Sequence, residues 1–291
     1  MDYRLAAVVE LLNLEQLEVN LFRGMSLDVG SPQVFGGQVL GQALKAAYGT
    51  VEPDRIAHSL HAYFLLRGDF NAPIVYSVDR ARDGRSFTSR RVIAIQHGEQ
   101  IFNMAASFQV PQPGVEHQLT MPVVPGPESL PVAARVEEMP SHLSERQRHY
   151  FAHEWPFEFR MVPWGAADSG PGGAPGRYVW LRAVDKLPDD DVLHRCLLAY
   201  VSDLQLLATA TLPHVMPKDS ATVVLASIDH AMWFHRPLRV DEWFLHAIQS
   251  PSASGARGFA RASIFSRDGV LAASTAQEGL MRIGTQHPVR G

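Results

Sequence analysis

Apolar residues run almost without a break from Leu197 to Leu212, in the stretch LLAYVSDLQLLATATL, and this run contains one acid, Asp203. Read as a helix, the run gives Asp203 apolar neighbours one turn away, while its more polar stripe of Ser202, Gln205 and Thr209 points elsewhere. An isolated carboxylate is costly to bury unless it is paired, hydrogen-bonded or used in chemistry. We therefore expect the rest of the chain to supply a partner or a use for this acid.

The hydrophobic pattern also divides the chain into two similar series of elements. Each series begins with a long apolar helix, expected over residues 35–51 in the first half and 193–212 in the second. Four runs rich in β-branched and aromatic residues follow each helix and predict strands. They cover residues 58–66, 72–81, 86–96 and 100–109, and then 221–229, 242–250, 257–266 and 270–282.

The region between the two series is irregular. Seven prolines lie between Val110 and Ser141, and the stretch SGPGGAPG occupies residues 169–176. Prolines and glycines at this density are typical of linkers or long surface loops. The boundaries predicted from this pattern are an N-terminal unit at residues 1–111, a Pro-rich linker at 112–150 and a C-terminal unit at 151–291.

The last strands of the two halves resemble each other directly. A shift of 168 residues aligns AASFQ at 105–109 with ASTAQ at 273–277, and turns are expected at His97-Gly98 and Asp268-Gly269. This repeat indicates duplication of one α+β unit, and it places Asp203 opposite Gln42 or its neighbours. Because each helix is apolar almost all round, we expect a curved antiparallel sheet to wrap it, with the two sheets merged and a groove between the units.

Composition narrows the class of protein. The chain has 291 residues, of which 46% are hydrophobic and 19% charged, so it is globular. The net charge of −4 gives no sign of nucleic-acid binding. Its one cysteine, Cys196, forms no internal disulfide, and no stretch has the length of a membrane span or the order of a signal peptide. We expect a cytoplasmic protein with no membrane span.

Several stretches carry a specific resemblance, in order, between residues 21 and 282. They are LFRGMSLDVGSPQVFGGQVLGQAL, HSLHAYFLLRGD, RDGRSFTSRRVIAIQHG, IFNMAASFQ, YVSDLQLL, SIDHAMWFHRP, SGARGFAR and STAQEGLMR. The sequence with these motifs resembles the acyl-CoA thioesterase II family, the TesB-like double-hotdog thioesterases. The resemblance implies an α+β double-hotdog fold and hydrolysis of acyl-CoA to fatty acid and coenzyme A without a cofactor. It also implies a homodimer or homotetramer.

The family's catalytic residues fall on Asp203 of VSDLQ, Ser227 of ASIDH and Gln277 of AQEG. The family usually has Thr at the second position, and Ser227 keeps the hydroxyl but lacks the methyl group that stiffens the side chain. These residue types suit thioester hydrolysis, because Asp203 can act as a general base on water while a hydroxyl and an amide hold that water. Burial is expected to raise the pKa of Asp203 toward working pH.

Two further groups are predicted to bind substrate. The Gly-rich entry to the first helix, Gly36-Gly37-Gln38, offers N-terminal amides for the developing oxyanion. Arginines on repeat-related strands offer guanidinium groups for the phosphates of coenzyme A, although ordinary surface charge is the simpler interpretation. These arginines are Arg90, Arg91, Arg257 and Arg261.

Other chemistries are less well supported by the sequence. Asp229 and His230 are expected to be structural or to line the groove, and the remaining histidines lack the spacing of a metal site. No G-x-S-x-G motif marks a serine nucleophile. Two alternatives stay open at this point, an enoyl-CoA hydratase on the same fold and a non-catalytic acyl-CoA binding protein.

Overall fold

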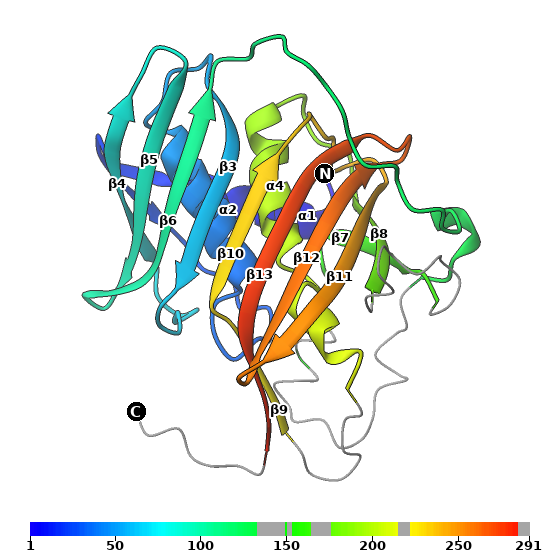
Figure 1. Ribbon diagram of the computed structural model, residues 1–291. Coiled ribbons are helices and arrows are strands. Elements are labelled where there is room, and N and C mark those ends of the chain that lie inside the picture. Colours follow the sequence, from blue (N-terminus) through cyan, green and yellow to red (C-terminus); the bar gives the residue numbers. More distant parts are fainter. Residues whose placement is uncertain (133–148, 150–152, 164–175, 215–221, 285–291) are drawn as a thin grey trace.

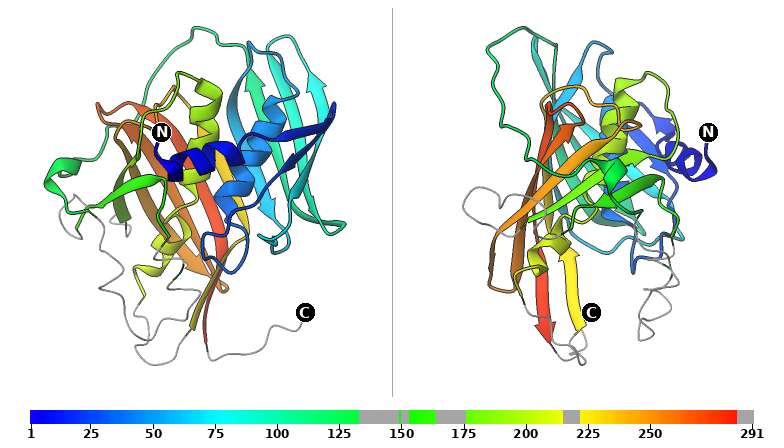
Figure 2. Two further views of the ribbon diagram at one scale, coloured as in Figure 1. Left: turned by 180° about the vertical axis from the view of Figure 1, so that it is seen from behind. Right: turned by 90° about the vertical axis from the view of Figure 1, so that its right-hand side faces the viewer.

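The computed structural model describes residues 1–132, 149, 153–163, 176–214 and 222–284. Within these residues the strands form one 13-stranded sheet, and every strand pair is antiparallel. The central helices α2 and α4 and the N-terminal helix α1 lie together on one side of this sheet (Figures 1 and 2). Two α+β units with merged sheets, as the sequence predicts, make up the architecture.

The bounds of the elements follow the chain in two series. The first series is α1 (Tyr3–Leu11), β1 (Glu15–Glu18), β2 (Leu21–Gly24), α2 (Gly36–Tyr48), β3 (Ile56–Phe64), β4 (Ile74–Asp83), β5 (Phe87–Gln96) and β6 (Glu99–Gln109). The second is β7 (Phe157–Met161), β8 (Gly176–Ala183), α4 (Asp191–Ser202), β9 (Thr222–Ser227), β10 (Asp229–Phe234), β11 (Phe244–Ser254), β12 (Arg257–Ser266) and β13 (Leu271–Gly284). Two short 3-10 helices, η1 (Pro127–Ser129) and η4 (Leu207–Thr211), complete the list.

The order of strands across the sheet shows the duplication. It reads β1-β2-β4-β5-β6-β3-β10-β13-β12-β11-β8-β7, with β9 also paired to β13. The second half therefore repeats the first in reverse order about the β3–β10 pair. The eight strand runs expected from the sequence correspond to β3–β6, β9 and β11–β13. The prediction missed β10 and the strands that precede each central helix.

Glycines allow the two central helices to pack closely. A Cβ at Gly37 would lie 2.0 Å from the carbonyl oxygen of Tyr200, and one at Gly41 would lie 3.0 Å from that of Cys196. Residue numbers rise along α2 as they fall along α4 at these contacts, so the helices are antiparallel. The N-terminus of α2 therefore meets the C-terminus of α4, where Asp203 lies.

Helix α4 is shorter than predicted. The expected helix over 193–212 ends at Ser202, Asp203 is its C-cap residue, and Gln205 adopts a left-handed backbone with φ of 66°. The side chain of Arg177 donates to Gln205 Oε1, which holds this turn before η4 begins. Asp203 is thus at the end of a helix and not in its middle.

The repeat exists, but its predicted register is wrong. A shift of 171 residues aligns the hairpin glycines Gly98 and Gly269, both with positive φ, and it aligns Gln277 with Ala106. Both of these side chains are buried, whereas Gln109 is partly exposed. Side chains alternate between the two faces of a strand. The predicted shift of 168 differs from the observed 171 by an odd number of residues, so it aligns inward-facing residues of one half with outward-facing residues of the other.

The helix alignment with Gln42 is also wrong. Gln42 lies in the middle of α2, where its amide donates to Leu11 O and Met25 O and accepts from the Tyr76 hydroxyl. The C-cap residue of α2 is Gly49, and this is the residue in the place that Asp203 has in the second half.

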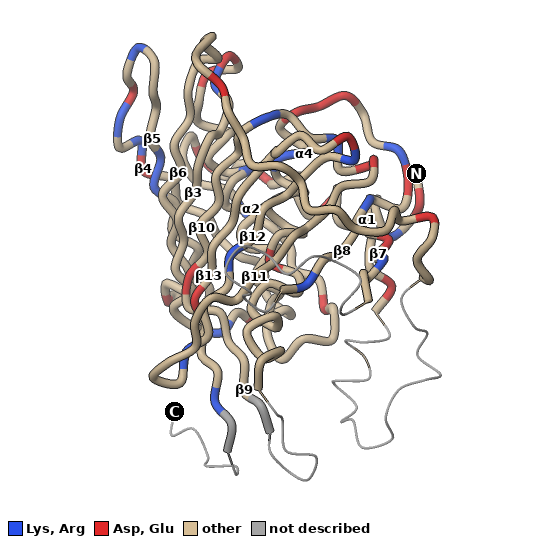
Figure 3. The backbone as a smooth tube through the Cα atoms, turned by 45° about the vertical axis from the view of Figure 1, so that its right-hand side comes forward, with Lys and Arg blue, Asp and Glu red and all other residues tan. Residues whose placement is uncertain are grey.

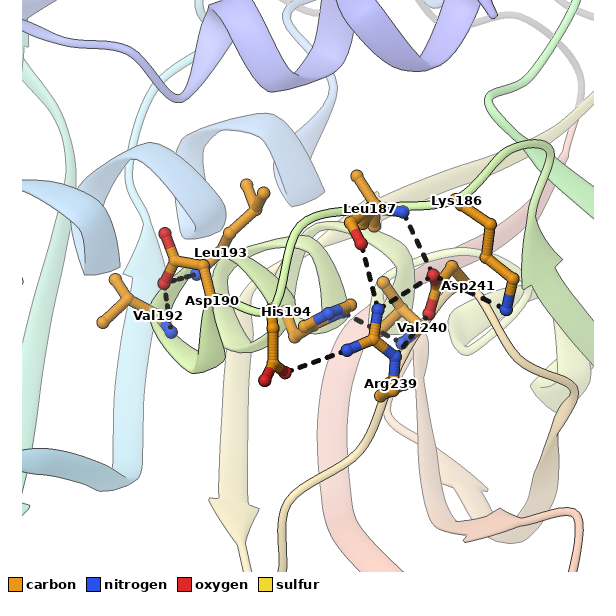
Figure 4. Close-up of polar contacts among 10 residues, drawn as sticks. Lys186, Leu187, Asp190, Val192, Leu193, His194, Arg239, Val240 and Asp241 are labelled. Carbon is orange, nitrogen blue, oxygen red and sulfur yellow. Dashed lines mark hydrogen bonds and ion pairs between the residues drawn. The ribbon is translucent and has the colours of Figure 1, made fainter. Parts of the chain in front are cut away.

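A polar network fixes the start of α4 (Figure 4). The carboxylate of Asp190 accepts from the amides of Val192 and Leu193, as an N-cap residue does. The guanidinium of Arg239 donates to Asp241 and to Leu187 O, and the buried Asp241 carboxylate also accepts from the Leu187 amide. These bonds hold the helix at its beginning, 12 residues before its C-cap acid.

The Pro-rich segment after β6 crosses to the second half of the molecule (Figure 1). The Trp180 indole donates to Pro125 O, and the Gln118 amide donates to Gly269 O. Charged residues occur mostly in loops and at strand ends, for example along the β4–β5 hairpin (Figure 3). The predicted unit boundaries at 111/112 and 150/151 stay predictions, and residues 133–148 and 150–152 lie outside the described residues. No helix in the described part of the chain is long and apolar enough to cross a membrane.

Candidate active site

Three side chains from distant parts of the chain meet below the end of α4. The Gln277 amide nitrogen Nε2 donates to Asp203 Oδ1 at 2.7 Å and to Ser227 Oγ at 3.0 Å. Asp203 caps α4, Ser227 ends β9 and Gln277 lies on β13, which pairs with β9. The residues that the family resemblance selected from the sequence are therefore neighbours in the fold.

The three residues differ in exposure, and the two that could contact a water molecule are the accessible ones. Gln277 is fully buried, whereas Asp203 and Ser227 each keep part of their surface accessible. The amide oxygen Gln277 Oε1 has no hydrogen-bond partner within the described part of the chain. One rigid amide thus holds two accessible groups and retains an acceptor of its own.

The carboxylate of Asp203 also touches the N-terminus of α2. A Cβ at Gly36 would lie 2.8 Å from Asp203 Oδ2, so only glycine fits there, and the backbone N–H of Gly37 hydrogen-bonds to the carboxylate. Burial raises the pKa of Asp203 above its usual value of 3.8, and the hydrogen bonds from Gln277 and Gly37 oppose this rise. The partial positive charge of the α2 N-terminus favours the ionised form as well. The result is an acid that is largely buried and hydrogen-bonded.

Two of the three amides predicted to form the oxyanion site, at Gly36-Gly37-Gln38, already have other hydrogen-bond partners. The Gly37 N–H serves Asp203, as described above, and Gln38 N–H donates within the first turn to Phe35 O. The side chain of Gln38 is buried, and it bonds to the Leu27 amide and Met25 O. The prediction for Gln38 is wrong because its backbone N–H and its side-chain amide are both bonded to residues before α2 or at its start. Gly36 stays the candidate donor.

The predicted phosphate contact at Arg90 is also wrong. The Arg90 side chain is 2% exposed, and its five N–H groups make five hydrogen bonds. The acceptors are Thr50 Oγ1 and O, Arg82 O, Ser89 O and Asp83 Oδ1. No donor is left for a substrate, because Arg90 holds the end of α2 against β4 and β5.

The other three arginines lie on exposed strand positions. Arg91 and Arg261 alternate with inward-facing residues, so they point to the face of the sheet opposite the helices and Asp203. Arg257 pairs with Glu278 at 2.9 Å, and both side chains are exposed. A role for these three in binding coenzyme A stays a prediction.

Phe64 is an apolar neighbour of the site. Its ring lies 3.1 Å from the Cβ position of Gly36, and it forms an apolar wall beside Asp203. Phe64 is the last residue of β3 and lies within the strand predicted over 58–66, where an aromatic residue favours a place in the core or at an interface. In the described part of the chain, no group of three His, Cys, Asp or Glu side chains is arranged to hold a metal ion.

The merged α+β units with helices on one face define a hotdog-fold protein. The chain is similar to a conserved protein from Alicyclobacillus acidocaldarius whose structure is described as having a hot dog fold. The TM-score is 0.73 at 20% identity over 97% of this chain and 99% of that one. This likeness establishes the double-hotdog architecture.

More specific comparisons establish the family. The model described as "Acyl-CoA thioesterase" matches residues 146–280, and the one described as "Acyl-CoA thioesterase N-terminal domain" matches 26–109. Acyl-CoA thioesterase 2 of Haemophilus influenzae is 44% identical over 94% of this chain and 96% of that protein. The acyl-CoA thioesterase II TesB2 structure from Mycobacterium marinum is 45% identical with a TM-score of 0.82, covering 95% of this chain and 98% of that one. The chain belongs to the acyl-CoA thioesterase family, a family of thioester hydrolases.

Proposed function

We propose that this protein hydrolyses acyl-CoA thioesters with a water molecule that Asp203 deprotonates. The observation that carries the proposal is the Gln277 amide, which donates to Asp203 and Ser227 at 2.7 and 3.0 Å and so brings a carboxylate and a hydroxyl to one accessible point. A general base must lie within hydrogen-bond reach of the proton it removes, and this point is where a water would sit.

The chemical step follows from the roles of these groups. Asp203 takes one proton from water, and the water oxygen forms a bond to the thioester carbonyl carbon. The tetrahedral intermediate then collapses, the C–S bond breaks, and the departing thiolate of coenzyme A takes up the proton held by Asp203, which restores the carboxylate. The Gln277 amide supports Asp203 throughout, because a donor at 2.7 Å stabilises the carboxylate form.

Two donors are available for the oxygen atoms of this reaction. Ser227 Oγ accepts from Gln277, so its own proton points away from that amide and can bind the water or the carbonyl oxygen. The Gly36 N–H, at the positive end of α2, is proposed to stabilise the oxyanion. The Gly37 N–H cannot do so while it is bonded to Asp203.

The test is release of free thiol from acyl-CoAs of increasing chain length, with the Asp203→Asn variant as control. The proposal expects thiol release that depends on Asp203, and saturable acyl-CoA binding without thiol release would contradict it. An absorbance assay with crotonyl-CoA separates the hydratase alternative, which consumes the enoyl double bond and releases no thiol. A homodimer or homotetramer and a cytoplasmic location stay predictions from the sequence.

A further inference from the structure

The first two residues of β10 contact both flanks of the proposed catalytic centre. Asp229 Oδ1 accepts from the backbone amide of Glu278 at 2.7 Å, and Glu278 directly follows Gln277. His230 Nε2 lies 3.1 Å from the hydroxyl oxygen of Ser202, and Ser202 directly precedes Asp203. One short segment is therefore bonded to the neighbours of the acid and of the amide.

The hydrogen-bond pattern assigns the proton on His230. The Ser202 hydroxyl donates to Ala199 O at 2.9 Å, so its single proton is used and His230 must donate from Nε2. Burial, and secondarily the neighbouring His246, lowers the pKa of His230 to about 3. The imidazole is therefore neutral at the pH at which the enzyme would work, and its one N–H is used by Ser202.

The position of His230 connects the helix end to the strand that carries Gln277. Helix α4 ends at Ser202, and the last turn of a helix lacks the hydrogen bonds that fix its interior. In the sheet Ala231 pairs with Ala276, so His230, one residue earlier, comes beside Gln277 on the buried face. The Ser202–His230 bond thus spans from the last helical residue to the neighbour of the catalytic amide.

We propose that His230 is a positioning residue, which donates to Ser202 and thereby keeps Asp203 in register with Gln277. The inference rests on the proposed function, because it takes Asp203 as the general base. The Ser202–His230 bond is expected to affect the rate through geometry, since a displacement of about 1 Å at a reacting group can lower the rate on the order of 100-fold. Asp229 supports the same arrangement from the other side through Glu278.

The experiment compares substitutions of two buried histidines. His230→Phe removes the donor and keeps a ring, and His230→Gln places an amide donor near the former Nε2. His246→Phe is the matched control, because His246 is equally buried and its Nε2 has no hydrogen-bond partner within the described residues. We expect His230→Phe to lower kcat by roughly 10-fold to 100-fold with little change in KM, His230→Gln to restore most of it, and His246→Phe to retain it.

The pH profile separates positioning from a general loss of stability. Within the described residues, the shift of Asp203 comes from burial, Gln277 and Gly37, with no charged neighbour contributing. Weakening the Gln277 contact should therefore move the acidic limb of the kcat profile to higher pH in His230→Phe. Loss of kcat in proportion to melting temperature in both histidine variants, with an unmoved limb, would overturn the inference.

Further variants distinguish failure of the proposed function from failure of the positioning role alone. If Asp203→Asn retains wild-type thiol release, the proposed function fails, whatever the histidine variants do. If Asp203→Asn is inactive but His230→Phe keeps its kcat and its pH limb, the positioning role alone fails. Should His230→Phe not fold, Ser202→Ala removes the acceptor with a minimal change in volume, and the same fall in kcat and shift of the limb are required of it.

Discussion

Replacing Asp203 by Asn tests the proposed mechanism with almost no change in shape. The carboxylate accepts a hydrogen bond from Gln277 at 2.7 Å and one from the Gly37 N–H. An amide has one acceptor oxygen for these two donors, and it cannot take a proton from water. General-base catalysis contributes about 10²–10⁴-fold, so thiol release should fall by that factor, which corresponds to about 3–5 kcal/mol of activation free energy.

The same substitution should not destabilise the protein at neutral pH. Burial raises the pKa of Asp203 in the folded state above its value in the unfolded chain. The folded protein therefore prefers the protonated acid, and this contribution to stability, present at low pH, is lost as pH rises through the folded-state pKa. Asn cannot ionise, so Asp203→Asn should melt at a temperature at or above that of wild type at pH 7.5. This advantage should shrink toward pH 4.

The assay combines thiol release with thermal unfolding at both pH values. Glu278→Gln is the matched control, because it makes the same chemical change one residue from Gln277, on an exposed side chain paired with Arg257. The control should keep its rate within about twofold, since an exposed ion pair contributes little. An Asp203→Asn rate within tenfold of wild type, or a loss of rate matched by a fall in melting temperature at pH 7.5, would refute the reasoning.

Three other predictions follow from single contacts. Ser227→Ala should lower the rate of thiol release by roughly 100-fold because it removes a hydroxyl from the site, whereas Ser227→Thr, which keeps the hydroxyl, should stay within about threefold. Gly37→Ala should lower the free energy of unfolding by about 3 kcal/mol in thermal melts, because its Cβ would meet Tyr200 O at 2.0 Å, while Gly114→Ala, with nothing within 4 Å, should be neutral. Asp241→Asn should cost about 2–3 kcal/mol at pH 7, since the carboxylate accepts from Leu187 and Arg239. Interactions with Arg239 and Leu187 hold the pKa of Asp241 below its usual value despite burial, so the Asn variant and wild type should converge in stability as pH falls through that pKa.

The sequence predicted what depends on local periodicity and missed what depends on termini and register. Runs of β-branched and aromatic residues identified the strands between Ile56 and Gln109, because such side chains pack well on a sheet with one face buried against a helix. The helix expected to continue to Leu212 ends ten residues earlier, since its apolar pattern continues through the turn at Gln205 and η4. The stripe expected to be polar contains Ser202 and Thr209, which are 1% and 0% exposed. Their partners, His230 and Gln205 O, are contacts that hydrophobic periodicity does not report.

For the candidate site too, the sequence predicted some residues correctly, and only the fold shows the contacts of the others. Three motifs selected Asp203, Ser227 and Gln277, and the fold brings them together. The choice of Arg90 failed because strand arginines look alike in sequence, and only the fold shows that Thr50 and Asp83 take its donors. The glycines at the start of α2 were singled out as amide donors, but their close approach to Tyr200 and Asp203 is a property of helix packing.

The corrected register explains why one half of the protein carries the acid. Gly49 and Ala106 in the first half stand where Asp203 and Gln277 stand in the second. Arg90 pairs with Ala106 as Ala260 pairs with Gln277, and Arg90 bonds to Thr50 just beyond the end of α2. In the first half, the hydrogen bonds of Arg90 thus fix the end of α2, and they add stability. The second half keeps a largely buried acid with a raised pKa and, among the described residues, an amide oxygen without a hydrogen-bond partner, both of which cost stability. A merged sheet and closely packed helices join the two halves, so the stability that Arg90 adds in the first half offsets the cost of the proposed water-activating centre in the second.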